Sequence, residues 1–179
     1  DGRAIAVVCW RSLLTGSPHP DVCSIDGAGG SGAERTVVGS EAREDQGEIS
    51  PDGRWLAYFT NDALMKVPIA GGPATTICRT AQAMGPAAWL PDARIVFAAR
   101  EPVSAIVVVE PGADTTRLLA PTDRERRVEG REPFVSGFHG VCAAPDGHAV
   151  YAGSWDGETL EDMNIVRVDL SSGAVTHVI

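Results

Sequence analysis

Hydrophobic and polar residues alternate along short stretches of this chain, and each stretch follows a turn signal. The segment Pro51-Asp52-Gly53-Arg54 recurs as Pro91-Asp92-Ala93-Arg94 and as Pro145-Asp146-Gly147-His148, and Asp1-Gly2-Arg3 is the same motif without its proline. The aspartates stand at positions 1, 52, 92 and 146, so the spacings are 51, 40 and 54 residues. A repeat of this length indicates one supersecondary unit that is copied along the chain.

When the four copies are aligned, several aligned positions, here called columns, are apolar in every copy. Proline, aspartate and glycine favour a tight turn, and the run that follows each turn reads as a strand with one inward and one outward face. The first inward column is aliphatic in every copy: Ile5, Leu56, Val96, Val150. Two more columns mark the next strand: Cys23, Met65, Ile106, Val166 and Ile25, Val67, Val108, Val168. The residue after each turn is basic or histidine, as an outward column requires.

These columns predict an all-β fold. A short third strand follows each glycine turn, and the residues that lead into each proline read as the innermost strand. No window has a clean helical period, and the best, 79–90, is interrupted by Gly85-Pro86. The pattern predicts a β-propeller of about four consecutive four-stranded antiparallel blades in an incomplete ring. The repeats cover residues 1–40, 41–85, 86–120 and 138–179, with 121–137 as a linker between blades.

One turn departs from the pattern, because Ala93 stands where the other copies have Gly2, Gly53 and Gly147. If the turns share one shape, Ala93 must adopt a left-handed conformation that is strained for any residue with a Cβ atom. Asp92 can still hold the turn through a bond to its own backbone.

Residues 49–58 and 66–73 resemble the TolB-type, WD-repeat-like propeller family, and residues 164–173 resemble another common form of its third strand and turn. The resemblance covers the whole chain and is loosest in residues 1–40. The first unit lacks a leading strand, and insertions occur at 11–20 and 155–163. The motif residues of that family are structural, so the resemblance supplies no catalytic, cofactor-binding or metal-binding residue.

The resemblance implies a non-catalytic scaffold that binds a protein or a small-molecule ligand at a propeller face, where rigid blades display variable loops. The second repeat is most similar to the sensor propellers of bacterial membrane-bound serine/threonine kinases, which would place the chain outside the cytoplasm. The alternative is a gating propeller of a prolyl-oligopeptidase-type serine peptidase whose catalytic domain lies elsewhere. The chain begins inside a turn motif without Met, so we interpret it as part of something longer.

Composition excludes several other classes. The 179 residues carry a formal net charge of −9, and the densest basic segment, 123–132, is balanced by its own acidic residues. Nucleic acid is therefore a poor partner. No stretch approaches the roughly 20 apolar residues that span a bilayer, and we expect no membrane contact by this segment.

Candidate catalytic motifs fail on spacing. A nucleophile elbow needs G-x-S-x-G, whereas Gly153-Ser154-Trp155-Asp156-Gly157 has the wrong order, and Phe134 precedes Ser136-Gly137 where a glycine is needed. The segment 154–159 also resembles a sialidase Asp-box but lacks one residue, and it reads as a polar hairpin loop. We therefore expect this chain not to be an enzyme.

Other reactive residues have plain structural interpretations. The four histidines, His19, His139, His148 and His177, lie in different units and show no ligand or triad spacing. Glu158, Glu161 and Asp162 cluster near the last hairpin, but calcium loops alternate their oxygens more tightly. We expect no cofactor and no metal.

The four cysteines, Cys9, Cys23, Cys78 and Cys142, contain no C-x-x-C pair. Small buried strand residues are the simplest interpretation. A hairpin centred near Gly16 would place Cys9 directly opposite Cys23, close enough for a disulfide. Both interpretations stay open.

Overall fold

The computed structural model describes residues 4–10, 20–26, 34–38, 45–79, 83–100, 104–110, 112, 116–122, 137–155 and 163–179. For residues 4–10, 20–22, 24–26, 34–35, 45, 120–122, 155 and 163 it describes the backbone only. Within these ranges every regular element is a strand, and no helix is long and apolar enough to cross a membrane. The chain divides into two compact units, Asp1–Ala81 and Gln82–Ile179.

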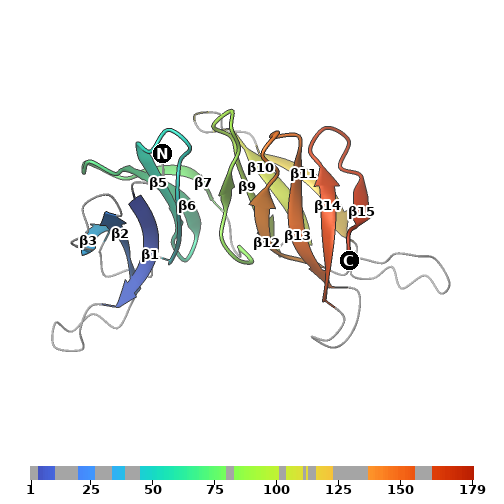
Figure 1. Cartoon of the computed structure of the whole chain (residues 1–179), viewed down its shortest axis with the longest axis horizontal. Helices are drawn as coiled ribbons and strands as arrows, with labels where there is room; N and C mark the ends of the chain where they lie inside the picture. Colours follow the sequence, from blue (N-terminus) through green and yellow to red (C-terminus); the bar gives the residue numbers. More distant parts are fainter. Residues whose placement is uncertain are drawn as a thin grey trace. The chain divides into compact units, whose positions relative to one another are not determined.

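Unit 1 contains two antiparallel sheets, which follow one another in the chain (Figure 1). The first has the order β1-β2-β3, with β1 (Ala4–Trp10), β2 (Pro20–Asp26) and β3 (Glu34–Val38). The second has the order β4-β5-β6-β7, with β4 (Asp45–Ile49), β5 (Trp55–Phe59), β6 (Ala63–Pro68) and β7 (Thr75–Arg79). Leu56, Tyr58 and Val67 of the second sheet form a core with Val37 and Val38 of the first.

Unit 2 contains two four-stranded antiparallel sheets, each a meander in which consecutive strands are neighbours. One consists of β8 (Ala88–Trp89), β9 (Ile95–Ala99), β10 (Ser104–Val109) and β11 (Thr116–Thr122). The other consists of β12 (Gly137–Ala143), β13 (Ala149–Trp155), β14 (Met163–Asp169) and β15 (Val175–His177). Consecutive antiparallel meanders are propeller blades, which confirms the predicted fold class.

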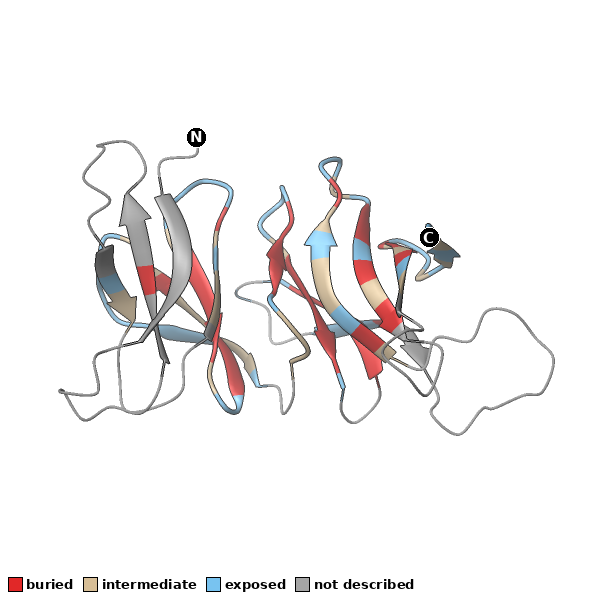
Figure 2. Cartoon of the chain, turned by 60° about the horizontal axis from the view of Figure 1, so that its bottom comes forward, coloured by how far each residue is buried: buried red, intermediate tan, exposed pale blue. Residues whose placement is uncertain are grey.

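The two sheets of unit 2 share one apolar core, and Figure 2 shows the buried strand residues of both sheets in red. The sheet β8–β11 contributes Leu90, Val96, Ala98, Ile106, Val108 and Leu119. The sheet β12–β15 contributes Phe138, Val150, Ala152, Val166, Val168 and Leu170. The apolar columns of the sequence are therefore inward where the structure describes their side chains. Met65 alone is only half-buried, and it packs against the core of unit 1.

The register of the first hairpin corrects one expectation. Cys23 lies opposite Val7, and Cys9 lies opposite Asp21, so the hairpin is centred one residue earlier than Gly16. This register matches apolar positions with each other, because Ile5 also lies opposite Ile25. The predicted direct opposition of Cys9 and Cys23 is wrong.

The cysteines nevertheless differ in redox state. Cys23 is fully buried and disulfide-bonded, whereas Cys78 and Cys142 are free thiols. The side chain of Cys9 lies outside the described residues, so its pairing with Cys23 stays a prediction.

Candidate functional site

The repeated Asp turns have the same local geometry in all three copies that the structure describes. The aspartate Oδ1 accepts a hydrogen bond from the backbone N–H two residues later, at 3.1 Å in Asp52, 3.2 Å in Asp92 and 2.9 Å in Asp146. The residue that directly follows each aspartate has a positive φ: 72° at Gly53, 69° at Ala93 and 71° at Gly147. The predicted left-handed conformation of Ala93 is confirmed.

The turn around Ala93 differs in how it closes. The N–H of Leu90 donates to the carbonyl of Arg94 at 2.8 Å, whereas Ser50 and Ala144 donate to the fifth residue after them. The alanine turn therefore keeps the repeated conformation but closes one residue earlier. Arg94 also donates to Asp92, with Nε 2.8 Å from Oδ2, which adds a side-chain brace at this turn.

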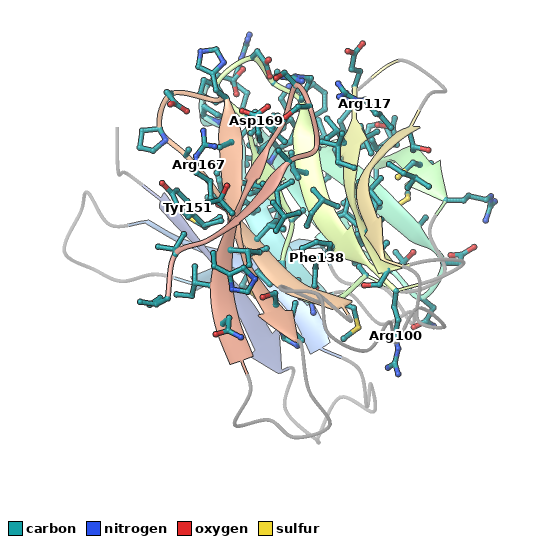
Figure 3. All side chains as sticks on the ribbon, turned by 90° about the vertical axis from the view of Figure 1, so that its right-hand side faces the viewer. Arg100, Arg117, Phe138, Tyr151, Arg167 and Asp169 are labelled. Carbon is teal, nitrogen blue, oxygen red and sulfur yellow. The ribbon has the colours of Figure 1, made fainter. Side chains whose placement is uncertain are left out.

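In unit 2 the turns of both sheets meet at one end. A Cβ atom on Gly147 would stand 3.1 Å from Cδ of Pro91, which belongs to the corresponding turn of the preceding sheet. On the same end, an Nη of Arg117 donates to the carbonyl of Ser171 at 2.6 Å. We call this surface, made of residues 91–94, 110, 112, 145–148 and 170–174, the turn end of unit 2. Figure 3 shows Arg117 and Asp169 toward this end and Arg100 at the other.

The last turn is built around Asp169, which follows directly from β14. Its Oδ1 accepts hydrogen bonds from both the N–H and the hydroxyl of Ser171, at 3.1 and 2.6 Å, and from those of Ser172, at 3.0 and 2.9 Å. These bonds, the Ser171 hydroxyl first, hold the pKa of Asp169 well below its usual range. The carboxylate is therefore committed to holding its own turn.

Asp52, in the turn between β4 and β5 of unit 1, is also held by bonds within its own turn. The hydroxyl of Ser50 donates to Asp52 at 2.6 Å, and Arg54 adds a backbone and a side-chain bond. These contacts, led by the Ser50 bond, lower the pKa of Asp52 from 3.8 to about 2. Acid–base catalysis near neutral pH is favoured by a carboxyl whose pKa is raised, whereas the bonds that hold these two turns lower the pKa of both Asp52 and Asp169.

The structure distributes the candidate histidines over separate positions. His139 is exposed on β12, His148 is exposed at the turn end, and His177 is half-buried on β15. Strands β12 and β15 are the two edges of their sheet, so His139 and His177 are not brought together. His19 lies outside the described residues. In the described ranges, no three of His, Cys, Asp and Glu form a group that could hold a metal ion.

Ser154 lies near the end of β13 and is 1% exposed. Its position inside a strand differs from the sharp strand-to-helix turn that exposes a hydrolase nucleophile. Among the described residues its hydroxyl has no hydrogen-bond partner. The other motif residues, namely Ser136, Asp156, Gly157, Glu158, Glu161 and Asp162, lie outside the described ranges.

Sequence reasoning missed how closely the segment that precedes β8 approaches β12 of the next sheet. The N–H of Gly140 donates to the carbonyl of Met84 at 2.6 Å, and a Cβ on Gly85 would stand 2.7 Å from Cα of Gly140. A β-bulge between His139 and Val141 gives Gly140 a φ of 63°. A glycine inside a strand is the available signal for such an approach.

No known family model matches this sequence, and no curated protein matches it. The fold is similar to that of solved structures at low identity. TolB from Acinetobacter baumannii has a TM-score of 0.72 at 19% identity, covering 97% of this chain and 41% of that one. A TolB protein from Agrobacterium tumefaciens has a TM-score of 0.68 at 21% identity, covering 89% and 55%.

A third similar structure is a puromycin-hydrolyzing peptidase of Mycobacterium tuberculosis, with a TM-score of 0.70 at 18% identity. The match covers 99% of this chain and 27% of the peptidase. The chain thus spans from about a quarter to about half the length of the three. The fold is that of TolB-like β-propeller proteins.

Proposed function

We propose that this chain is a non-catalytic β-propeller scaffold that binds a protein or a small ligand. Its parent would be a larger bacterial envelope or signalling protein, and the chain would form a sensor region outside the cytoplasm. The support is the fold shared with the two TolB proteins, together with the resemblance of the second repeat, residues 41–85, to sensor propellers. Because fold alone does not determine function, the proposal also requires a surface on this chain at which a partner could bind.

The turn end of unit 2 is the surface that supports it best. Short turns from two sheets meet there, and Asp169 and Asp92 use their carboxylates to fix those turns. The Arg117–Ser171 bond ties one sheet to the next. Because the turn backbones are held before binding, little further ordering is needed when a partner docks. This prior fixation of adjacent turns is the observation that carries the proposal.

A gating role is the second candidate. It is supported by the similarity to the mycobacterial peptidase, which covers nearly all of this chain. In that case the catalytic domain would belong to the same polypeptide, and the turn end or its opposite end would face it. The two candidates differ in the partner that the chain contacts.

Site-specific photo-crosslinking tests the proposal. A benzophenone amino acid replaces His148 at the turn end or, as a matched control, the exposed Arg100 that follows β9 at the opposite end. Both variants are expressed in the parent polypeptide in its native host. We expect a discrete adduct from position 148 and none from position 100. An adduct with a hydrolase domain of the same polypeptide would select the gating role, and equal labelling from both positions would contradict the proposal.

A further inference from the structure

The three described Asp turns share one backbone arrangement but differ in the side chains around the aspartate. In each turn the carboxylate accepts a hydrogen bond from the backbone N–H two residues later. The residues two positions before the aspartates are Ser50, Leu90 and Ala144, and those two positions after them are Arg54, Arg94 and His148. These flanking residues determine how firmly each carboxylate is held.

Side chains brace two of the three aspartates. The Ser50 hydroxyl donates to Asp52 at 2.6 Å, and Nε of Arg54 donates to it at 2.8 Å. Arg94 braces Asp92, with Nε 2.8 Å and an Nη 2.7 Å from Oδ2. A carboxylate held in this way must lose a charge-assisted hydrogen bond before its side chain can move.

Asp146 lacks the equivalent side-chain donors. Ala144 stands where the first turn has serine, and His148 stands where both other turns have arginine. Among the described residues, the Asp146 carboxylate has one hydrogen bond, from the N–H of His148 at 2.9 Å. Asp146 is also exposed, so its carboxyl group can change rotamer more easily than those of the other two turns.

The exposure of Asp146 does not depend on whether another sheet follows β12–β15. Asp92 occupies the equivalent place in the sheet β8–β11, which is already followed and packed by β12–β15. The Asp92 side chain is nevertheless 53% exposed. Successive turns approach through the proline of one and the glycine of the next, as Pro91 and Gly147 do. A further blade would therefore contact Pro145 and leave Asp146 exposed.

The residue that follows the aspartate is the second difference. Gly147 has no Cβ, so Cγ of the preceding aspartate can approach its backbone nitrogen, whereas the methyl group of Ala93 hinders that approach. The N–H of this residue donates to the carbonyl three residues earlier in every turn, at 2.8 Å for Gly53, 3.0 Å for Ala93 and 2.9 Å for Gly147. That bond restrains the three turns alike. Among the described turns, only that of Asp146 combines a following glycine with a carboxylate that no side chain braces.

We propose that Asp146-Gly147 is a site of spontaneous isoaspartate formation in the folded chain. The backbone nitrogen of Gly147 attacks Cγ of the protonated Asp146 carboxyl and forms a new C–N bond, and the amide proton and the carboxyl hydroxyl leave as water. Water then opens the resulting succinimide. Cleavage between the nitrogen and Cγ restores aspartate, whereas cleavage between the nitrogen and the backbone carbonyl carbon of Asp146 gives isoaspartate. The isomerisation therefore needs no oxidant and no cofactor.

The product alters the turn end of unit 2. In isoaspartate the main chain runs through Cβ and Cγ, so the turn gains one backbone methylene group while its negative charge is retained. Gly147 packs against Pro91 of the neighbouring turn, and the longer backbone displaces it from that contact. The modification changes the shape of this surface whether or not a partner binds there.

Peptide mapping of the purified, folded chain after prolonged incubation at mildly acidic pH tests the site. Electron-transfer fragmentation distinguishes isoaspartate from aspartate at each position, so the Asp-Gly pairs at 1–2, 26–27 and 156–157, which the structure does not describe in full, stay out of the comparison. We expect isoaspartate to form about fivefold or more faster at Asp146 than at Asp52, because no side-chain hydrogen bond must break first. We expect none at Asp92.

Reciprocal substitutions provide matched controls. Ala144→Ser supplies the hydroxyl that Ser50 provides in the first turn and should slow conversion of Asp146, whereas Ser50→Ala should accelerate conversion of Asp52. Ala144 and Ser50 are both 6% exposed, so the two environments are comparable. In urea, where the turns are lost, both aspartates should convert at similar rates because glycine follows each. Circular dichroism verifies that each variant is folded, and either substitution alone tests the bracing.

Three results would overturn the proposal. The first is an equal rate at Asp146 and Asp52 in the folded chain. The second is conversion of Asp146 in urea but not in the folded chain, which would mean that the bond from Gly147 to Ala144 protects the site. The third is a rate difference that neither Ala144→Ser nor Ser50→Ala reduces.

Discussion

Gly147 lies so close to Pro91 that a Cβ atom at position 147 would stand 3.1 Å from the proline Cδ. The contact joins equivalent turns of successive sheets in unit 2. Gly53 has nearly the same φ, 72° against 71°, but its Cβ would meet nothing within 4 Å. A side chain at Gly53 would therefore meet only the backbone strain of a left-handed residue, whereas a side chain at Gly147 would also collide with Pro91 of the neighbouring sheet.

Substituting alanine at both positions tests this difference. Gly53→Ala should lower the free energy of unfolding by about 1 kcal/mol, because only the left-handed backbone is strained. Gly147→Ala should lower it by about 2 kcal/mol, since the new methyl group also displaces Pro91. Urea denaturation measures both changes. Equal losses in the two variants would show that the contact with Pro91 relaxes at no cost.

The pKa of Asp52 should be close to 2 and should depend on Ser50. The Ser50 hydroxyl makes the largest contribution to the lowering, followed by the bonds from Arg54. Ser50→Ala should therefore raise the pKa toward the usual 3.8, measured by NMR titration of the Asp52 carboxyl carbon.

The sign of the pH dependence follows from this shift. Because the folded pKa is lower than the unfolded one, the contribution of Asp52 to stability is present above pH 3.8 and is lost as the pH falls toward 2. Asp52→Asn should remove this part of the acid dependence of unfolding. An unchanged acid profile in that variant would contradict the assignment.

The thiols should react in a fixed order. Cys142 is exposed, whereas Cys78 is half-buried and its burial raises its thiol pKa. Alkylation of the folded chain should modify Cys142 first, because the thiolate is the reacting form. Mass spectrometry should find Cys23 unmodified without reductant, and mapping of the linked peptides tests whether Cys9 is its partner. Rapid labelling of Cys23 would contradict the disulfide.

The purified chain should not turn over ester, peptide or phosphate substrates. Ser154 is buried inside β13, and the histidines at positions 139 and 177 lie on opposite edges of one sheet. A nucleophile needs a base within hydrogen-bond reach. Chromogenic esters and peptides provide the assay, with Ser154→Ala as the diagnostic variant. Steady turnover that this substitution abolishes would refute the non-catalytic role.

The sequence predicted the fold well because propeller repeats impose one pattern on every copy. Leu56, Val96 and Val150 occupy the same column and are all buried. Contacts between copies were not predictable in the same way. The Arg117–Ser171 bond joins residues 54 positions apart, and the Gly85–Gly140 approach depends on a bulge in β12. Neither contact produces a pattern that repeats along the sequence, so neither could be recognised by comparing the copies.

The predicted register of β1 and β2 was wrong for a local reason. The segment between these strands has no two-residue turn signal, so the sequence does not determine where the hairpin is centred. The structure pairs Ile5 with Ile25 and Val7 with Cys23. A hairpin centred at Gly16 would also oppose apolar residues, Val7 with Ile25, so the apolar pattern does not distinguish the two registers. The turn end also could not be predicted from the sequence, because it combines turns that are far apart in the chain and belong to two sheets.

The equivalence of the repeated turns, on which the propeller assignment depends, is tested most directly at Ala93. Its φ of 69° matches the glycines of the other turns, although its turn closes one residue earlier. Ala93→Gly should therefore raise the free energy of unfolding, by up to about 1 kcal/mol, since it removes left-handed strain. Gly53→Ala should change it by a similar amount in the opposite direction. A loss of stability in Ala93→Gly, as added unfolded-state entropy alone would produce, would show that the turns are not equivalent.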